Sequence, residues 1–379
     1  MKILIAPDSF KGSLTAIEFC RIAAEQIQSF IPDAKLDLIP LADGGEGTIE
    51  VILANTPGKT IAVSVQNPVG KAVNARYAIL AARQTAVIEM AQASGLPLLA
   101  ANEQNPMMTS SYGTGELIRH ALDQGCRHFI IGLGGSATND GGTGMLQALG
   151  IKFLDARQQT IQACGQTLNN IVNIDLTDFD PRIQESEIII AGDVSNPLCG
   201  ELGATYVYGP QKGADQKMLA ELETGMSHFA EKTSALFTTN TSLMDACGAG
   251  AAGGMGYALM AYCRATMKSG FELIAEFSRL DEMITSHDSR PDLIITGEGR
   301  FDSQSLQGKL VGQLSEKADK HNIPLIVICG HIGDDIDMNK ISPNISAFSL
   351  CQSPSNLDYS INHSAKLLKK LVSDLVRSF

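Results

Sequence analysis

The chain has 379 residues and a formal net charge of −12, with 44% hydrophobic and 18% charged residues. This acidic balance argues against a nucleic-acid or anionic-membrane partner, and a chain of this length is expected to form two domains. No apolar run approaches the ~20 residues that would span a bilayer. The eight cysteines include no CxxC pair, which favours reduced thiols. We therefore expect a cytoplasmic protein whose partners are small molecules, and a homo-oligomer stays open.

Short apolar runs followed by helical periodicity recur along the chain. The runs cover 2–6, 36–41, 128–133, 292–296, 324–329 and 345–350, which is typical of buried parallel strands. The helical segments cover 15–30, 47–54, 309–320 and 359–379. Strand followed by helix predicts an α/β fold with a Rossmann-like parallel-sheet domain.

Other segments indicate a second, distinct α/β domain with a mixed sheet. Residues 59–65, 72–81 and 85–90 form a predicted meander, 151–155, 187–191 and 205–208 are further strand candidates, and 249–261 is a glycine-rich helical segment. We expect residues 1–58, about 106–150 and 286–379 in the Rossmann-like domain, and about 59–105 and 151–285 in the second.

Polar, glycine-containing loops follow four of the predicted strands. They cover 7–13, 42–48, 134–140 and 297–302. Ligands of doubly wound sheets bind outside the carboxyl ends of the strands, so we expect these loops to converge on one edge.

The third loop belongs to the glycine-rich stretch 132–144, in which backbone N–H groups suit an anion. We predict phosphate or nucleotide contacts for Gly134, Gly135, Ser136 and Asn139; the alternative is a tight strand-to-helix connection. Lys212, which lies between glycines, is predicted to reach a phosphate, unless it is a solvated loop charge.

Charged residues in the other loops suit charge neutralisation. Lys11 fits a phosphate or carboxylate contact oriented by Asp8, although Asp8 also fits a helix cap. Arg300 fits transition-state neutralisation, or a simple ion pair with Asp302. Asp193 follows another predicted strand as a candidate base, or as an Asx-turn residue.

Three acids provide the oxygen ligands that magnesium prefers. Asp43 and Glu46 are flanked by glycines, and Glu298 follows another strand. For Asp43 and Glu46, acids at a helix N-terminus are the alternative explanation.

A second reading starts from 132–137, which matches the dinucleotide pattern Gly-x-Gly-x-x-Ala, with Asp155 at the distance of a ribose-binding acid. It predicts an NAD-dependent 2-hydroxy-acid oxidoreductase. The polar residues that follow, 138–142, argue against this alternative.

The stretch 248–256 is a further phosphate-facing turn or a site of close helix packing. P-loop, HExxH and Gly-x-Ser-x-Gly motifs are missing from the sequence.

Taken together, these loops resemble the type I glycerate kinase family of bacterial carboxylate metabolism. The resemblance is carried by 6–14, 41–48, 111–118, 132–144, 192–198, 209–214 and 296–302. It implies ATP-dependent phosphorylation of glycerate, usually at the 2-hydroxyl to give 2-phosphoglycerate, with magnesium on a two-domain scaffold. Within these motifs we assign glycerate binding to Ser9, Ser13 and Asn196. A non-catalytic carboxylate-binding protein is the remaining alternative.

Overall fold

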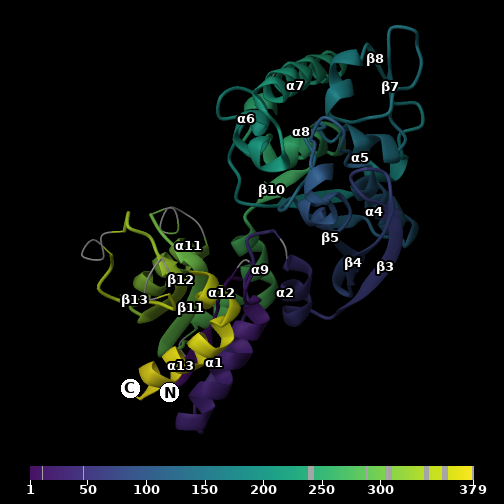
Figure 1. The fold of residues 1–379 in the computed structure, drawn as a ribbon. Coiled ribbons are helices and arrows are strands. Elements are labelled where there is room, and N and C mark those ends of the chain that lie inside the picture. Colours follow the sequence, from purple (N-terminus) through teal and green to yellow (C-terminus); the bar gives the residue numbers. More distant parts are fainter. Residues whose placement is uncertain are drawn as a thin grey trace. The chain divides into compact units, whose positions relative to one another are not determined.

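The chain divides into two compact units (Figure 1). Unit 1 comprises Met1–Asp43, Glu50–Thr56 and Gly270–Phe379, and unit 2 comprises Gly44–Ile49 and Pro57–Ser269. The computed structural model describes residues 1–377 apart from positions 11, 46 and 304 and the ranges 238–242, 287–288, 306–309, 337–340 and 352–356. The predicted site residues Lys11 and Glu46 therefore lie outside the described residues.

Unit 1 is built on a five-stranded parallel sheet with the order β13-β12-β11-β1-β2. Its strands are β1 (Lys2–Ile5), β2 (Lys35–Leu38), β11 (Leu293–Phe301), β12 (Leu325–Ile332) and β13 (Ile345–Ser349). Counted along the unit this is the order 2-1-3-4-5, which is a doubly wound sheet whose switch point lies between β1 and β11. The predicted Rossmann-like parallel sheet is confirmed.

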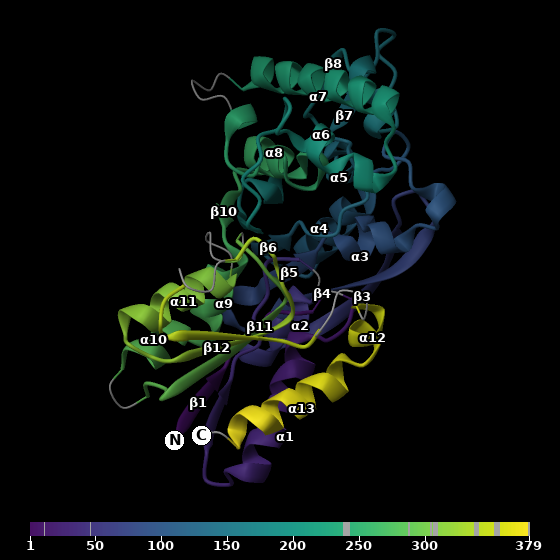
Figure 2. The same cartoon turned by 60° about the vertical axis from the view of Figure 1, so that its left-hand side comes forward.

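Helices flank this sheet. They are α1 (Ala16–Phe30), α9 (Gly270–Ser278), α10 (Leu280–Thr285), α11 (Leu310–Lys320), α12 (Leu357–Asn362) and α13 (Ser364–Val376). A capping box begins α1: the Glu18 amide donates to the Thr15 hydroxyl at 3.1 Å, and the Thr15 amide donates to the Glu18 carboxylate at 3.0 Å. Helices α1 and α13 lie side by side (Figure 2) and bury Phe19 and Leu368 in one cluster with Ile3.

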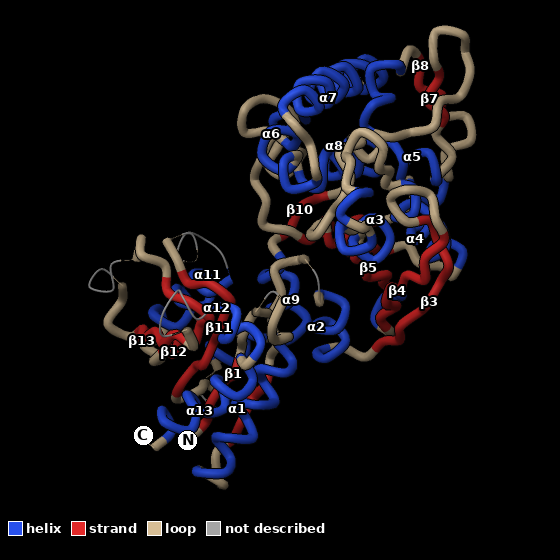
Figure 3. Tube along the Cα trace, viewed as in Figure 1, coloured by secondary structure: helices blue, strands red, loops and turns tan. Residues whose placement is uncertain are grey.

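Unit 2 contains a six-stranded mixed sheet with the order β10-β9-β6-β5-β4-β3. Figure 3 labels its strands β3, β4, β5 and β10. Its strands are β3 (Gly58–Gln66), β4 (Ala72–Leu80), β5 (Thr85–Glu89), β6 (His128–Gly132), β9 (Glu187–Ala191) and β10 (Thr266–Lys268). The first three pair antiparallel, as the predicted meander requires, and β5, β6, β9 and β10 are parallel. The predicted mixed sheet is confirmed.

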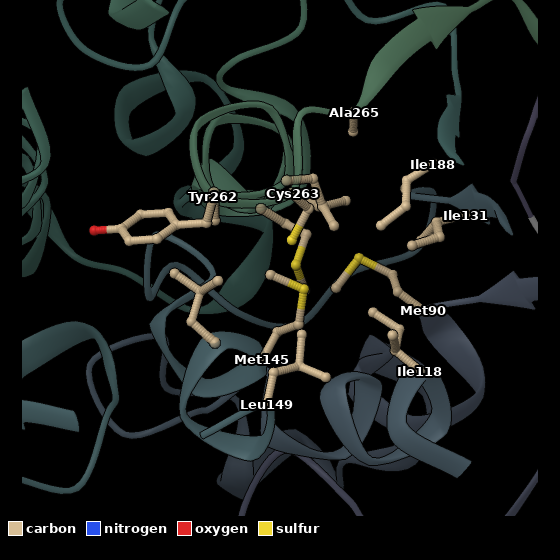
Figure 4. Packing of buried hydrophobic residues seen from close by; sticks show 14 of the residues in the cluster. Met90, Ile118, Ile131, Met145, Leu149, Ile188, Tyr262, Cys263 and Ala265 are labelled. Atoms are coloured by element: carbon tan, nitrogen blue, oxygen red, sulfur yellow. The ribbon is translucent and has the colours of Figure 1, made fainter. Parts of the chain in front are cut away.

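The helices and the strands of unit 2 together supply its apolar core. They are α3 (Ala91–Ser94), α4 (Tyr112–Asp123), α5 (Thr143–Ala148), α6 (Ala204–Tyr208), α7 (Gln216–Leu236) and α8 (Ala251–Cys263), and α2 (Thr48–Asn55) is divided between the units. Figure 4 shows Met145 of α5, Cys263 of α8 and Met90 packed together with Ile131 of β6. Unit 2 also contains a two-stranded antiparallel sheet formed by β7 (Lys152–Leu154) and β8 (Asn173–Asp175).

Two expectations from the sequence differ from the structure. Strand β6 pairs with β5 and β9, so residues 106–150 belong to unit 2 and not with the parallel-sheet unit, while 270–285 belong to unit 1. The predicted strand at 205–208 is wrong, because these residues form α6, which packs against α7 and α8. In the described part of the chain, no helix is long and apolar enough to cross a membrane.

Candidate functional site

In unit 1, Asp8 and Asp43 follow β1 and β2, whereas Glu298 lies within β11, which extends to Phe301 beyond the predicted strand end. The Asp8 amide donates to the Gly297 carbonyl at 2.8 Å, and the Leu41 amide donates to the Pro7 carbonyl at 2.8 Å. The parallel ladder thus continues past β1, with Asp8, Asp43 and Glu298 all half-buried at this edge. The edge includes the switch point of the sheet, where ligands of this architecture bind.

The other predicted residues of unit 1 make local contacts. Arg300 has a 65% exposed side chain, and its Nε lies 3.2 Å from a carboxylate oxygen of Asp302. Ser9 donates its amide to the Asp8 carboxylate at 2.7 Å, and the Ser13 hydroxyl donates to the Ile361 carbonyl at 3.1 Å. A guanidinium this exposed remains accessible to an anion despite its ion pair.

In unit 2, the loop after β6 is supported from inside by a buried lysine. Lys212 is 1% exposed, and its ammonium donates to the Ser136 hydroxyl at 2.8 Å and to the Thr138 carbonyl at 2.7 Å. Asn139 is also fully buried and donates to the Thr205 hydroxyl at 3.1 Å. In the structure, the hydrogen bonds of both side chains support the loop itself. Direct contact of Asn139 and Lys212 with phosphate stays a prediction.

Asp140 ties the end of this loop to two helices. It is fully buried and accepts the amide and the hydroxyl of Ser111, both at 2.8 Å, and the amides of Gly142 and Gly144 at 3.1 and 3.2 Å. The Ser111 hydroxyl in turn accepts the Met145 amide at 2.9 Å. Asp140 therefore satisfies N–H groups at the beginnings of α4 and α5, which such helix ends leave unpaired.

Burial is the largest cause of the pKa shifts of Lys212 and Asp140. Burial lowers the pKa of Lys212 to about 7, and the negative charge of Asp140 opposes this shift. Burial also raises the pKa of Asp140 above its ordinary value, against the lowering effect of its hydrogen bonds from Ser111, Gly142 and Gly144. Both pKa shifts are toward the neutral form, as expected for ionisable side chains buried away from solvent.

The glycines at 44 and 45 lie directly against the ends of β6 and β9. A Cβ added to Gly44 would lie 2.6 Å from the Ala191 carbonyl oxygen, and one added to Gly134 would lie 2.6 Å from the Cα of Gly45. Only glycine permits this approach of backbone to backbone. The second and third predicted loops are therefore in contact within unit 2.

The loop after β9 carries Asp193, which is exposed, directly beyond the strand end. Asn196 of the same loop is held by two hydrogen bonds: it donates to the Leu202 carbonyl at 2.8 Å and accepts the Tyr208 hydroxyl at 2.7 Å. Gly134 is half-buried and Gly135 is exposed. Gly135, Asp193 and Ser195 are thus exposed in the loops after β6 and β9.

The second glycine-rich stretch is a packing element. Residues 252–254 have positive φ, and the Gly141 amide donates to the Gly253 carbonyl at 2.9 Å. A Cβ at Gly253 would collide with the Thr138 carbonyl. Close packing against the 138–141 backbone therefore accounts for the glycines here.

The dinucleotide reading finds no support in this topology. The strand that follows α5 is β7, which pairs antiparallel with β8 in a two-stranded sheet and not beside β6. Asp155 accepts the amides of Arg157 and Gln159 at 2.8 and 2.9 Å, as an Asx turn does. A ribose-binding acid would have to follow a parallel strand next to β6.

Sequence reasoning missed two residues that organise this edge. Glu89 is the last residue of β5 and accepts the Ile49 amide at 2.8 Å. Its position at the end of a parallel strand is the same signal that drew attention to the other acids. Ser111 stands where a helix cap is preferred, before the Tyr112 helix.

Comparison with known proteins places the chain among two-domain small-molecule kinases of the α/β class. The chain belongs to the glycerate kinase family, whose family model matches residues 3–379. It is 45% identical to a glycerate 2-kinase of Escherichia coli (strain K12), covering 94% of this chain and 92% of that protein, and 40% identical to a glycerate kinase of Bacillus subtilis (strain 168), covering 100% and 97%. A crystal structure of a protein from Salmonella typhimurium LT2 superposes with a TM-score of 0.82 at 38% identity, covering 100% of this chain and 98% of that one.

Proposed function

We propose that the protein transfers the γ-phosphoryl group of ATP to the 2-hydroxyl of glycerate, producing 2-phosphoglycerate and ADP. The observation that carries this proposal is the end-to-end similarity to a protein named glycerate 2-kinase, at 45% identity. The strand-end loops supply what phosphoryl transfer needs, which is positioning and electrostatic stabilisation. The topology of β7 speaks against the oxidoreductase alternative.

We assign the reacting groups to the exposed and half-buried residues of the loops. Asp193 orients the glycerate hydroxyl and accepts its proton, while Lys11, oriented by Asp8, and Arg300 neutralise phosphoryl and carboxylate charge. Ser9, Ser13 and Asn196 are assigned to the glycerate side.

The nucleotide phosphates are assigned to the backbone of Gly134 and Gly135, which are not fully buried. Ser136, Asn139 and Lys212 then act by holding this backbone in place. Backbone N–H groups in a glycine-rich loop suit anionic phosphates, because they supply donors without a side chain in the way.

Magnesium fits the chemistry of three predicted acids. Asp43, Glu46 and Glu298 offer carboxylate oxygens, and this ion needs only one or two carboxylates when phosphates and water complete its shell. Among the described residues, no group of three His, Cys, Asp or Glu side chains is arranged to hold a metal. When bound, magnesium would neutralise the phosphate charge.

The test is ADP release with ATP, magnesium and glycerate, followed by identification of the phosphorylated position. Tartronate, glycolate and lactate serve as comparison substrates. We expect Asp193→Asn to lower kcat by about a hundredfold or more in a folded protein, because the proton acceptor is lost. Asp155→Asn is the matched control, since it alters a carboxylate that only an NAD enzyme would need. Release of ADP without glycerate, or normal turnover by Asp193→Asn, would contradict the assignment.

We place the protein in the cytoplasm with small molecules as its partners. All eight cysteines are free thiols, as a reducing compartment allows, and the net charge of −12 disfavours nucleic acid.

A further inference from the structure

Glu89 is a buried carboxylate at the centre of the strand ends of unit 2. It is 2% exposed, ends β5 and stands opposite Gly132 of β6 in the sheet register. A buried carboxylate requires hydrogen-bond donors. Its Oε1 accepts the Ile49 amide at 2.8 Å, and its Oε2 lies 3.4 Å from the side-chain nitrogen of Gln92.

The segment that Glu89 holds is short and is docked through its backbone. Gly44 and Gly45 lie against the ends of β9 and β6, and the Thr48 hydroxyl donates to the Gly45 carbonyl at 2.7 Å. Ile49 is the second residue of α2, so its N–H has no partner within the helix. A carboxylate at this end of α2 also interacts favourably with the helix dipole.

We propose that Glu89 is a positioning residue for the predicted magnesium-binding loop: by accepting the Ile49 amide, it anchors the beginning of α2 to the end of β5 and so positions the segment Gly44–Ile49. This inference rests on the proposed function, since Glu46 lies within that segment and Asp43 directly precedes it. Glu89 acts through the backbone of the loop and touches no substrate.

The experiment compares Glu89→Ala and Glu89→Gln with the wild type and with Glu187→Gln, an exposed glutamate at the amino end of β9. Hydrogen exchange is followed in peptides covering 44–49 and, as an internal reference, 128–133. Steady-state kinetics are measured as a function of free magnesium concentration.

We expect Glu89→Ala to speed exchange in 44–49 by about tenfold with 128–133 unchanged, because a hydrogen bond to a charged acceptor is lost. The half-saturating magnesium concentration should rise about tenfold, while KM for glycerate changes less. Glu89→Gln should restore most of both properties, because its carbonyl oxygen can still accept the Ile49 amide. Glu187→Gln should match the wild type.

Unchanged exchange in Glu89→Ala would overturn the anchoring role. Equal loss of activity in both Glu89 variants, with exchange in 44–49 at the wild-type rate, would also overturn it and point to direct contact with the reacting groups. If the wild type does not phosphorylate glycerate, the proposed function fails while the exchange measurement still decides what Glu89 holds.

Discussion

At the scale of single residues, the least expected group is the Lys212 ammonium. It replaces its hydration with one hydroxyl and one carbonyl of the loop that it supports, and Asp140 supplies the compensating charge. Removing one member of such an arrangement leaves the other buried without compensation. Lys212 and Asp140 therefore stabilise the loop conformation jointly.

This pair makes a prediction about pH. The pKa of Lys212 is about 7 in the folded protein against 10.5 as a free side chain, so between these values the unfolded chain binds a proton that the folded chain does not. The contribution of Lys212 to stability therefore rises with pH above about 7, by at most about 1.4 kcal/mol per pH unit, and is constant below that range. Both the wild type and Lys212→Met retain Asp140, so the difference between their free energies of unfolding reports the titration of Lys212.

The measurement is thermal unfolding of the wild type and Lys212→Met from pH 6 to 9. We expect the variant to be less stable by about 2 kcal/mol at neutral pH, with a gap that widens as pH rises. Lys217→Met, which alters an exposed lysine of α7, should follow the wild type throughout. A gap that narrows with rising pH would contradict the assigned protonation of Lys212.

At the scale of elements, the contact between the loops 44–45 and 132–134 depends on missing side chains. Gly134→Ala would place a methyl group 2.6 Å from the Cα of Gly45. We expect about 2 kcal/mol of lost stability, as for overpacked sites in general. Gly192→Ala is the matched control at the end of β9, because its added Cβ would meet nothing within 4 Å. The measurement is the free energy of unfolding of both variants by chemical denaturation. Equal values for the two variants would contradict the prediction and would mean that the loop accommodates the added methyl group.

Local sequence patterns predicted where helices and strands lie better than they predicted which strands pair in a sheet. Thr15 and Glu18 mark the beginning of α1 in the sequence itself, and the capping box forms. The stretch 205–208 misled because Thr, Tyr and Val favour strands, whereas contacts with α7 and α8 fold it as a helix. Strand β6 was recognised but placed in the wrong sheet, since its run of apolar residues specifies burial on both faces and not which strands lie beside it.

The candidate site shows the same limit of local sequence signals. Glycines and acids after strands identified the loops, because carboxyl ends of parallel strands are where ligands bind. Whether a loop side chain faces solvent or the interior depends on distant residues: Lys212 and Asn139 are buried by contacts with Ser136, Thr138 and Thr205. No local pattern around Lys212 carries that information.

At the scale of the whole molecule, ligands that bind the folded state should stabilise the protein, by an amount that grows with the logarithm of their concentration. A ligand present at a hundred times its dissociation constant adds about 2.7 kcal/mol if it binds only the folded state. We expect glycerate, and separately a non-hydrolysable ATP analogue with magnesium, to raise the Tm, and NAD to leave it unchanged. A rise in Tm with NAD alone would support the oxidoreductase alternative.

The chain assigns six residues, Gly44–Ile49, to unit 2, although the residues on both sides belong to unit 1. The remainder of unit 2 is one uninterrupted stretch, Pro57–Ser269, which resembles an insertion in the gene. A chimera that exchanges only this stretch with a relative would set foreign strand ends against the native glycines at 44 and 45. A chimera that keeps these contacts must therefore exchange Gly44–Ile49 together with Pro57–Ser269.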